Sequence, residues 1–309
     1  MTRLGAAHRV FLQKMHIDAG EPLRYSLDID ERGEKAPLDV NALIGHELRF
    51  EHTGELRCQA CHRSTRKSYG QGHCYVCFKR LARCDLCVMA PHRCHYDKGT
   101  CREPDWGESF CMQPHLVYLA NSSSLKVGIT REGGHLGRWR DQGALQGRIL
   151  ARAETRQAAG ELEVALAKTM GDRSQWRALV TSDAEPLDLD AAAEQARALV
   201  PDPGDKVNYV DAEEDTQTQH LQYPVSQWPP LERLNFKKTQ EFSGVLRGIK
   251  GQYLLFDTGV FNVREHTGYE VVIDILSEVV SEVVSEVKEV SSTVTKSVSQ
   301  SDLFGPDSD

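Results

Sequence analysis

Cysteines are the residues of this 309-residue sequence whose types and spacing indicate a defined chemistry. Eight of its nine cysteines lie between Cys58 and Cys101, and the first four form two pairs with two residues inside each pair and twelve between the pairs. Two tight knuckles with this spacing bring four thiolates around one tetrahedral Zn²⁺. Gly70 and Gly72 lie between the pairs and permit the sharp turns that a knuckle requires. The predicted ligands are Cys58, Cys61, Cys74 and Cys77.

A second cysteine group follows the first one directly. Cys84 and Cys87 again have two residues between them, and Cys94 and Cys101 are the simplest completion of a second set of four. The rival ligands are His92, His95, Cys111 and His115. Two sites of four cysteines each would be closed to water, whereas catalytic zinc keeps one position open, so both zinc sites are predicted to be structural. The alternative is a set of free or redox-active cysteines.

The predicted compartment follows from the same cysteines. The first twenty residues contain charged side chains and no apolar run, and no segment has the roughly 18 apolar residues that span a bilayer. Cysteine pairs mixed with histidines, without a signal peptide, indicate metal binding in a reducing compartment rather than disulfides. The sequence therefore predicts a cytoplasmic protein that does not enter the membrane.

Charge is distributed unevenly along the chain, whose net charge is -8. Residues 58–182 carry nineteen Lys/Arg against eleven Asp/Glu, while acidic residues dominate 183–215 and 277–309. A local charge of +8 favours an anionic partner such as DNA or RNA, and a solvated surface is the alternative. Basic residues also surround the knuckles, as in zinc ribbons that touch phosphates. They are Arg63, Arg66, Lys67, Lys79, Arg80 and Arg83.

The elements that must position these residues can be read from hydrophobic periodicity and turn signals. Short apolar strands dominate both ends of the ordered sequence, with a turn expected at residues 52–54. The middle of the chain alternates strands with an amphipathic helix. The expected central elements are strands over Leu116–Ala120, Lys126–Thr130 and Arg148–Ala153, a short helix around Arg138–Gln142, and a longer helix over Glu154–Met170.

The predicted fold class is α+β. Because a sheet of three or four strands needs a partner, the N- and C-terminal strands are expected to combine into a small barrel or sandwich. The expected segments are an N-terminal β segment (1–57), a zinc-binding cysteine-rich module (58–112), an α/β domain (113–182), a solvated acidic connector (183–240), a C-terminal β segment (241–275) and a flexible tail (276–309).

The α/β segment resembles the GIY-YIG nuclease core in the run His115–Asn121, the run Lys126–Thr130, Arg138 and Glu163. In that family a hairpin presents a tyrosine and a glycine, one helix supplies an arginine, and a later helix supplies a glutamate that binds a divalent metal. The resemblance implies these roles for Tyr118, Gly128, Arg138 and Glu163, with Mg²⁺ or Mn²⁺ at Glu163 and with Glu161 less favoured.

Two positions depart from the family pattern, because Leu116 replaces the first motif's glycine and Lys126 replaces the second motif's tyrosine. Lys126 would provide a second positive charge for phosphodiester hydrolysis, which needs a base, a cation on the phosphate and a metal on a hard carboxylate. The alternative is an apolar hairpin with a core tyrosine, a solvated arginine and a surface glutamate.

Almost the whole sequence, roughly residues 5–275, also resembles a bacterial family of unknown function, number 2797. The residues that carry this resemblance include Gly72–Tyr75, Gly99–Pro104, Tyr118–Ser123 and Gly248–Leu254. That family implies no established activity. The leading hypothesis is thus a zinc-binding protein that acts on nucleic acid as a divergent GIY-YIG endonuclease. The alternatives are a non-catalytic nucleic-acid-binding module and a protein-interaction adaptor.

The tail contains a second recognisable feature. After a Ser-Glu-Val-Val repeat, Gln300–Phe304 is similar to the pentapeptide by which bacterial repair and replication proteins bind the sliding clamp. Large apolar side chains are unusual in a polar terminus. In a linear motif Leu303 and Phe304 would anchor in a hydrophobic pocket while Gln300 forms a hydrogen bond beside it.

Overall fold

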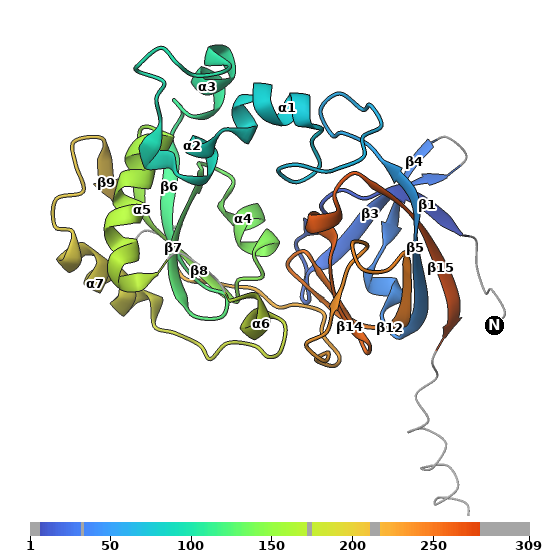
Figure 1. Cartoon of the computed structure of the whole chain (residues 1–309). Helices are drawn as coiled ribbons and strands as arrows, with labels where there is room; N and C mark the ends of the chain where they lie inside the picture. Colours follow the sequence, from blue (N-terminus) through green and yellow to red (C-terminus); the bar gives the residue numbers. More distant parts are fainter. Residues whose placement is uncertain (1–6, 32–33, 172–174, 211–216, 279–309) are drawn as a thin grey trace, which may run out of the picture.

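The computed structural model describes residues 7–31, 34–171, 175–210 and 217–278 (Figure 1). The chain forms two lobes, a larger one built on a ten-stranded sheet and a smaller one built on a five-stranded sheet. The cysteine-rich segment, residues 58–112, lies between β5 and β6 in the sequence. Its helices run along one side of both lobes (Figure 1) and are α1 (Tyr75–Arg80), α2 (Leu86–Met89) and α3 (Pro104–Phe110). Within the described ranges, no helix is long and apolar enough to cross a membrane.

The larger sheet combines strands from both ends of the chain. Its order is β11-β14-β13-β12-β5-β15-β1-β3-β2, with β4 paired to β3. Its strands are β1 (His8–Phe11), β2 (His16–Asp18), β3 (Arg24–Glu31), β4 (Glu34–Asp39), β5 (His46–Leu56), β11 (Arg233–Leu234), β12 (Glu241–Lys250), β13 (Tyr253–Phe256), β14 (Gly259–Asn262) and β15 (Tyr269–Glu278). The short helices η1 (Asn41–Leu43) and η5 (Val263–His266) join consecutive strands.

The pairings explain why neither end of the chain forms a sheet alone. Strand β5 pairs with β12 on one side and β15 on the other, and β15 also pairs with β1. Phe50 of β5 stacks on Phe242 of β12 at 5.3 Å and contacts Phe256 and Phe261, so one aromatic core is built from both termini. Across the described strands the path from β11 to β2 does not close, so the predicted closed barrel is wrong.

The turn expected at residues 52–54 is wrong, because strand β5 continues without a break from His46 to Leu56. Glu51 pairs with Glu241 of β12 and with Val272 of β15. Gly54 has φ +92° within the strand, a value that glycine adopts easily. Long-range pairing on both edges therefore overrides the local turn signal.

The smaller sheet is antiparallel, with the order β10-β8-β6-β7 and β9 paired to β8. Helix α4 covers one face of it, and α5 and α7 cover the other. Its elements are β6 (His115–Asn121), β7 (Leu125–Arg131), α4 (His135–Asp141), β8 (Gln146–Ala153), α5 (Arg156–Met170), α6 (Trp176–Leu179), α7 (Leu189–Leu199), β9 (Val207–Tyr209) and β10 (Gln219–His220).

The acidic segment that was expected to be a solvated connector contributes to this smaller lobe. Ala192, Ala193 and Ala196 of α7 are buried against the sheet, and β9 extends the sheet beside β8. Short alanine side chains let the helix approach closely while its acidic residues stay on the outer face. Helix α7 and strands β9 and β10 of the expected connector therefore belong to the smaller lobe, while β11 of the same range pairs with β14 in the larger sheet.

Polar contacts fix the two lobes to each other near α4. Asp141 at the end of α4 accepts a hydrogen bond from Gln252 at 3.0 Å and forms an ion pair with Lys14 at 2.9 Å. Lys250, whose side chain is fully buried, donates to Asp183 at 2.8 Å. These contacts set the position of α4 and of the site beside it.

Candidate metal centre and polar cluster

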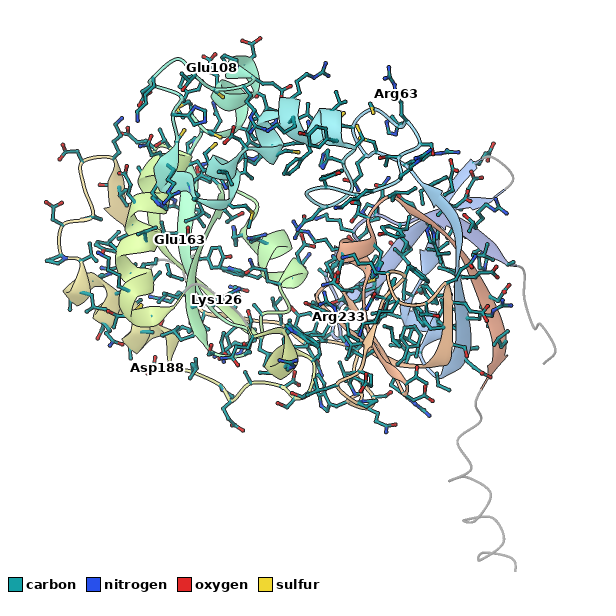
Figure 2. All side chains as sticks on the ribbon, in the orientation of Figure 1. Arg63, Glu108, Lys126, Glu163, Asp188 and Arg233 are labelled. Carbon is teal, nitrogen blue, oxygen red and sulfur yellow. The ribbon has the colours of Figure 1, made fainter. Side chains whose placement is uncertain are left out.

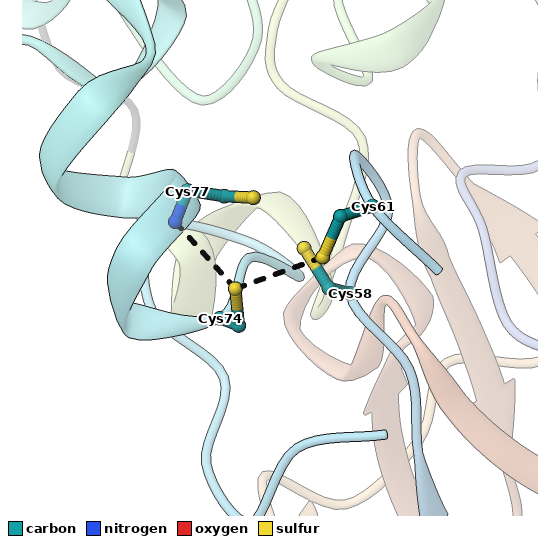
Figure 3. Close-up of side chains that lie close together, drawn as sticks. All are labelled: Cys58, Cys61, Cys74 and Cys77. Carbon is teal, nitrogen blue, oxygen red and sulfur yellow. Dashed lines mark hydrogen bonds between the residues drawn. The ribbon is translucent and has the colours of Figure 1, made fainter. Parts of the chain in front are cut away.

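The first four predicted cysteines come together in one cluster (Figure 3). Their sulfur atoms lie within 4.8 Å of one another, and the Sγ atoms of Cys61 and Cys74 are 3.8 Å apart. Sulfur atoms at the corners of a tetrahedron around zinc, with bonds of about 2.3 Å, are about 3.8 Å apart. The four-cysteine cluster is therefore confirmed, and its geometry fits a structural zinc ion.

Local backbone geometry explains how the two knuckles form. Cys74 caps helix α1 (Tyr75–Arg80), where its Sγ accepts from the N–H of Cys77 at 3.5 Å. The N–H of Gln59 donates to Gly72 O at 2.8 Å and joins the two knuckles. Gly72 has φ +100°, and a Cβ there would lie 2.9 Å from Cγ of Gln59. Only glycine allows this close approach without a shift of the neighbouring chain.

Two thiols of the cluster differ in the direction in which their surroundings shift their pKa. Burial raises the pKa of the Cys58 thiol, but backbone hydrogen bonds from Cys74, Cys61 and Ala60 outweigh it and lower that pKa to about 6. Burial and the neighbouring sulfurs raise the pKa of Cys77 to about 12. Four thiolates in this volume would repel each other strongly without a cation, and a bound Zn²⁺ supplies that positive charge.

The second predicted cysteine group is divided by the structure. Cys84 packs against the first cluster, beside Cys58 and Cys77. Cys87, Cys94 and Cys101 lie elsewhere, around a small cavity that Cys111 also lines. The rival ligand His95 has its ring within 4.8 Å of Cys87 and Asp85 ligand atoms. Of the other rivals, His115 is buried and its Nδ1 lies 2.7 Å from Gln113 O, and His92 is half-buried.

In the smaller lobe, two of the four predicted catalytic residues, Tyr118, Lys126, Arg138 and Glu163, meet at one oxygen atom. Tyr118 of β6 donates its hydroxyl hydrogen to Oε1 of Gln142 at 3.0 Å, and Lys126 of β7 donates to the same oxygen at 2.8 Å. Gln142 is the residue that ends α4. Sequence reasoning missed its role, although it stands at the end of the helix expected around Arg138–Gln142.

The other two residues, Arg138 and Glu163, act electrostatically on Tyr118. Burial raises the pKa of Tyr118, the positive charge and a hydrogen bond of Arg138 lower it, and the negative charge of Glu163 raises it. Figure 2 shows Lys126 and Glu163 in the same part of the smaller lobe. Glu161 is exposed and pairs with Gln157 at 3.2 Å, so the structure favours Glu163 over Glu161 as the inward carboxylate.

The absence of a side chain at Gly128 leaves room for the ring of Tyr118. Gly128 lies directly opposite Tyr118 in the β6–β7 pairing, and a Cβ at Gly128 would lie 2.6 Å from the phenol oxygen. The Tyr118 ring therefore lies across a position that tolerates no side chain. Tyr118 and Lys126 are 0% and 5% exposed, whereas Arg138 and Glu163 are partly exposed. The polar cluster is therefore open to solvent on the side of Arg138 and Glu163.

A basic hollow of about 590 Å³ lies where the cysteine-rich segment meets the larger sheet. Five cationic side chains and one carboxylate line it, and the carboxylate, Glu265, pairs with Arg233 and with Lys237. Burial lowers the pKa of Arg264, and the charge of Arg138 lowers it further, so the hollow lies near the polar cluster. The lining residues are Arg66, Lys67, Ser68, Gln71, Arg233, Lys237, Asn262, Arg264, Glu265 and Tyr269.

Comparison with known proteins gives one match. A family model described as a protein of unknown function (DUF2797) matches residues 45–271. No curated protein and no solved structure matches the chain. The matched range contains the first cysteine cluster, the polar cluster and the residues of the basic hollow. The family description names no function, so the chemistry of these three sites is the basis for proposing one.

Proposed function

The chain belongs to the DUF2797 family of proteins of unknown function, and we propose that it is a zinc-binding protein that acts on nucleic acid as a divergent GIY-YIG-type, metal-dependent endonuclease. The observation that carries this proposal is the convergence of four titratable side chains. Tyr118 and Lys126 come from strands β6 and β7 of the smaller sheet, and Arg138 and Glu163 come from helices α4 and α5 that cover it. Titratable groups that converge in this way from separate elements are typical of catalytic sites.

Each of the four residues has a role that phosphodiester hydrolysis requires. Arg138 binds the scissile phosphate, and the charge of Lys126 supports it. The Glu163 carboxylate would hold Mg²⁺ or Mn²⁺, and such an ion would supply positive charge for the hydrolysis. Burial raises the pKa of Tyr118, so its hydroxyl stays protonated at neutral pH and orients the attacking water by a hydrogen bond.

Incubation of the zinc-loaded protein with DNA and RNA oligonucleotides, in Mg²⁺, Mn²⁺ or chelator, tests this proposal. Cleavage that requires the divalent ion is the expected result. Salt-sensitive binding with no cleavage of any substrate would contradict the nuclease and favour a non-catalytic nucleic-acid-binding module. Absence of both binding and cleavage would leave a protein-interaction adaptor.

The basic hollow supports a nucleic-acid substrate, because five cationic side chains and a single carboxylate line it, and one of the cations, Arg264, interacts electrostatically with Arg138. Arg66→Glu with Lys67→Glu is expected to weaken oligonucleotide binding at least about tenfold and to reduce the slope of log affinity against log salt by about two. Both side chains are exposed, so the fold should tolerate the change. Fluorescence anisotropy at several salt concentrations measures both quantities.

A matched pair of substitutions controls for net charge. Arg93→Glu with Lys98→Glu makes the same charge change in the cysteine-rich segment, at exposed positions outside the hollow. This control should bind with an unchanged salt slope. If the two double variants lose the same affinity and slope, binding follows overall charge and the hollow has no specific part in it.

The C-terminal tail is the basis for a proposed protein partner. Gln300, Leu303 and Phe304 lie outside the residues that the structure describes, and we propose that they bind the bacterial sliding clamp. Leu303→Ala with Phe304→Ala is expected to abolish co-purification with the clamp, because both apolar anchors are lost. Asp307→Ala with Asp309→Ala is the control and should retain it. Unchanged recovery of the clamp by the first variant would end this idea.

The proposal includes two structural zinc ions. The cluster of Cys58, Cys61, Cys74 and Cys77 holds the first ion. The second lies in the part of the cysteine-rich segment that follows, where Cys84, Cys87, Cys94 and Cys101 are the ligands predicted from spacing.

A further inference from the structure

Four cysteines outside the first cluster line one small cavity, where Asp85, Cys87 and His95 are the residues whose ligand atoms lie within 4.8 Å of one another. The cavity has a volume of about 10 Å³, which is close to the smallest space that holds one water molecule. Its lining includes Cys87, Cys94, Cys101 and Cys111. They come from four places along the segment: helix α2 (Leu86–Met89), the end of η3 (Pro91–Arg93), the loop before α3 (Pro104–Phe110), and the residue that ends α3. A cavity of this size has room for a single ion.

Cys84 is separated from these four thiols. It packs against the first cluster, beside Cys58 and Cys77. The ninth cysteine, Cys111, lines the cavity instead, together with Cys87 and Cys94.

Apolar packing contributes little to helix α2, which carries Cys87. Leu86 and Met89 of α2 are 76% and 84% exposed. Gly107 of α3 lies so close to the cavity that a Cβ there would be 3.2 Å from Sγ of Cys101. Short helices without a core of their own need another source of cohesion, which a metal ion supplies.

The rival ligands Asp85 and His95 lie beside Cys87 and also contact other side chains. Asp85 caps α2 by accepting from the N–H of Cys87 at 3.3 Å, and its other oxygen pairs with Arg102 at 2.6 Å. The Nδ1 atom of His95 lies 2.8 Å from Thr100 Oγ1, and its Nε2 faces Asp85 at 3.7 Å. Zinc is most often bound in closed structural sites by thiolate and imidazole ligands, so a carboxylate held by arginine is the weakest candidate.

We propose that Cys87, Cys94, Cys101 and Cys111 bind the second zinc ion, and that Cys84 is the one cysteine that binds no metal. This inference rests on the zinc part of the proposed function and not on the nuclease part. The spacing of the sequence favoured Cys84 because it forms a pair with Cys87. The fold instead turns Cys84 back onto the first cluster and brings Cys111 in from the end of α3.

The second site also anchors the helix that carries Glu163. Arg156, the first residue of α5, donates its backbone N–H to Cys111 O at 2.8 Å and its guanidinium to Cys87 O at 2.9 Å. Gly160 lets α5 approach η3 closely, since a Cβ there would lie 2.5 Å from Cβ of Pro91. The second zinc ion therefore positions the start of α5, two turns before Glu163.

Zinc content measured by mass spectrometry of the purified chain tests the ligand set. Wild type and Cys84→Ala should each contain about two zinc ions per chain, and Cys111→Ser about one. His95→Gln should keep about two. Retention of both ions by Cys111→Ser, or loss of one by Cys84→Ala or His95→Gln, would overturn the assignment. Cleavage activity plays no part in this count, so an inactive protein would contradict the nuclease and leave the inference intact.

Alkylation of the zinc-loaded wild type provides a second test if Cys111→Ser does not fold. A thiol reagent in mild denaturant, followed by peptide mapping, should label Cys84 first and spare the eight ligand cysteines until a chelator is added. Labelling of Cys111 with protection of Cys84 would instead restore the set predicted from spacing.

Discussion

Replacing Glu163 by glutamine is expected to lower metal-dependent cleavage of nucleic acid by on the order of 100-fold or more. Loss of a metal-binding carboxylate removes several kcal/mol of transition-state stabilisation, and about 1.4 kcal/mol corresponds to tenfold in rate. Glutamine keeps the size of the side chain and its hydrogen-bonding capacity. The affinity for uncleaved substrate should therefore change little, since the basic hollow is left intact.

Glu161→Gln is the matched control, because Glu161 lies on the same helix, is exposed and pairs with Gln157. It should cleave at the wild-type rate. The measurement is the single-turnover cleavage rate of a labelled oligonucleotide in saturating Mg²⁺ or Mn²⁺, with anisotropy to follow binding. Full activity in the Glu163 variant, or equal loss in both variants, would remove Glu163 from the proposed site.

Tyr118→Phe provides a further variant of the same experiment. The change removes the hydroxyl that donates to Gln142 and leaves the ring packed edge-on against Trp139 at 5.9 Å. Cleavage should fall while thermal stability changes by no more than about one hydrogen bond's contribution, ~1 kcal/mol. A fall in stability without a fall in rate would indicate a purely structural tyrosine.

Removal of zinc from the first cluster is the second large effect that we expect. Cys58→Ser should release the loop between residues 58 and 77, because structural zinc contributes on the order of 10 kcal/mol in comparable small sites. Beside the small buried cluster of Cys58, Cys77 and Leu81, this loop packs through Tyr69 on Phe78. Trypsin should then cut at Arg63, Arg66 or Lys67, which the folded loop protects.

Limited proteolysis with mass mapping measures this release, and Cys84→Ala is the control because that side chain packs on the cluster without being one of its four cysteines. The loop also forms one wall of the basic hollow through Arg66, Lys67 and Gln71. Oligonucleotide binding should thus weaken in parallel with the loss of protection. Trypsin resistance that survives both Cys58→Ser and chelation would show that the loop does not need the metal.

The local chemistry of this protein is determined by its sequence alone. Cys58, Cys61, Cys74 and Cys77 follow a spacing that only a compact pair of knuckles satisfies, and the structure gathers them as expected. The hairpin of β6 and β7 also follows from short-range signals, because an apolar run, a polar turn and a second run define two paired strands. Interactions between residues close in sequence were sufficient in both cases.

Only the tertiary structure decided the contacts between residues far apart in the chain. Periodicity could not show that Gln142 would bridge Tyr118 and Lys126, or that Glu163 rather than Glu161 would face them, because a rotation of α5 by part of a turn exchanges the two carboxylates. The open ten-stranded sheet and the unbroken β5 likewise depend on pairings between the two ends of the chain.

The cysteines show most clearly which features local sequence signals determine and which depend on tertiary contacts. Spacing identifies a pair such as Cys84 and Cys87, since a knuckle is a local structure, but it cannot determine which distant thiol completes a site. That choice depends on how α2, α3 and the start of α5 pack together. The packing places Cys84 on the first cluster and Cys111 beside Cys87, a juxtaposition of residues 24 positions apart that no local pattern specifies.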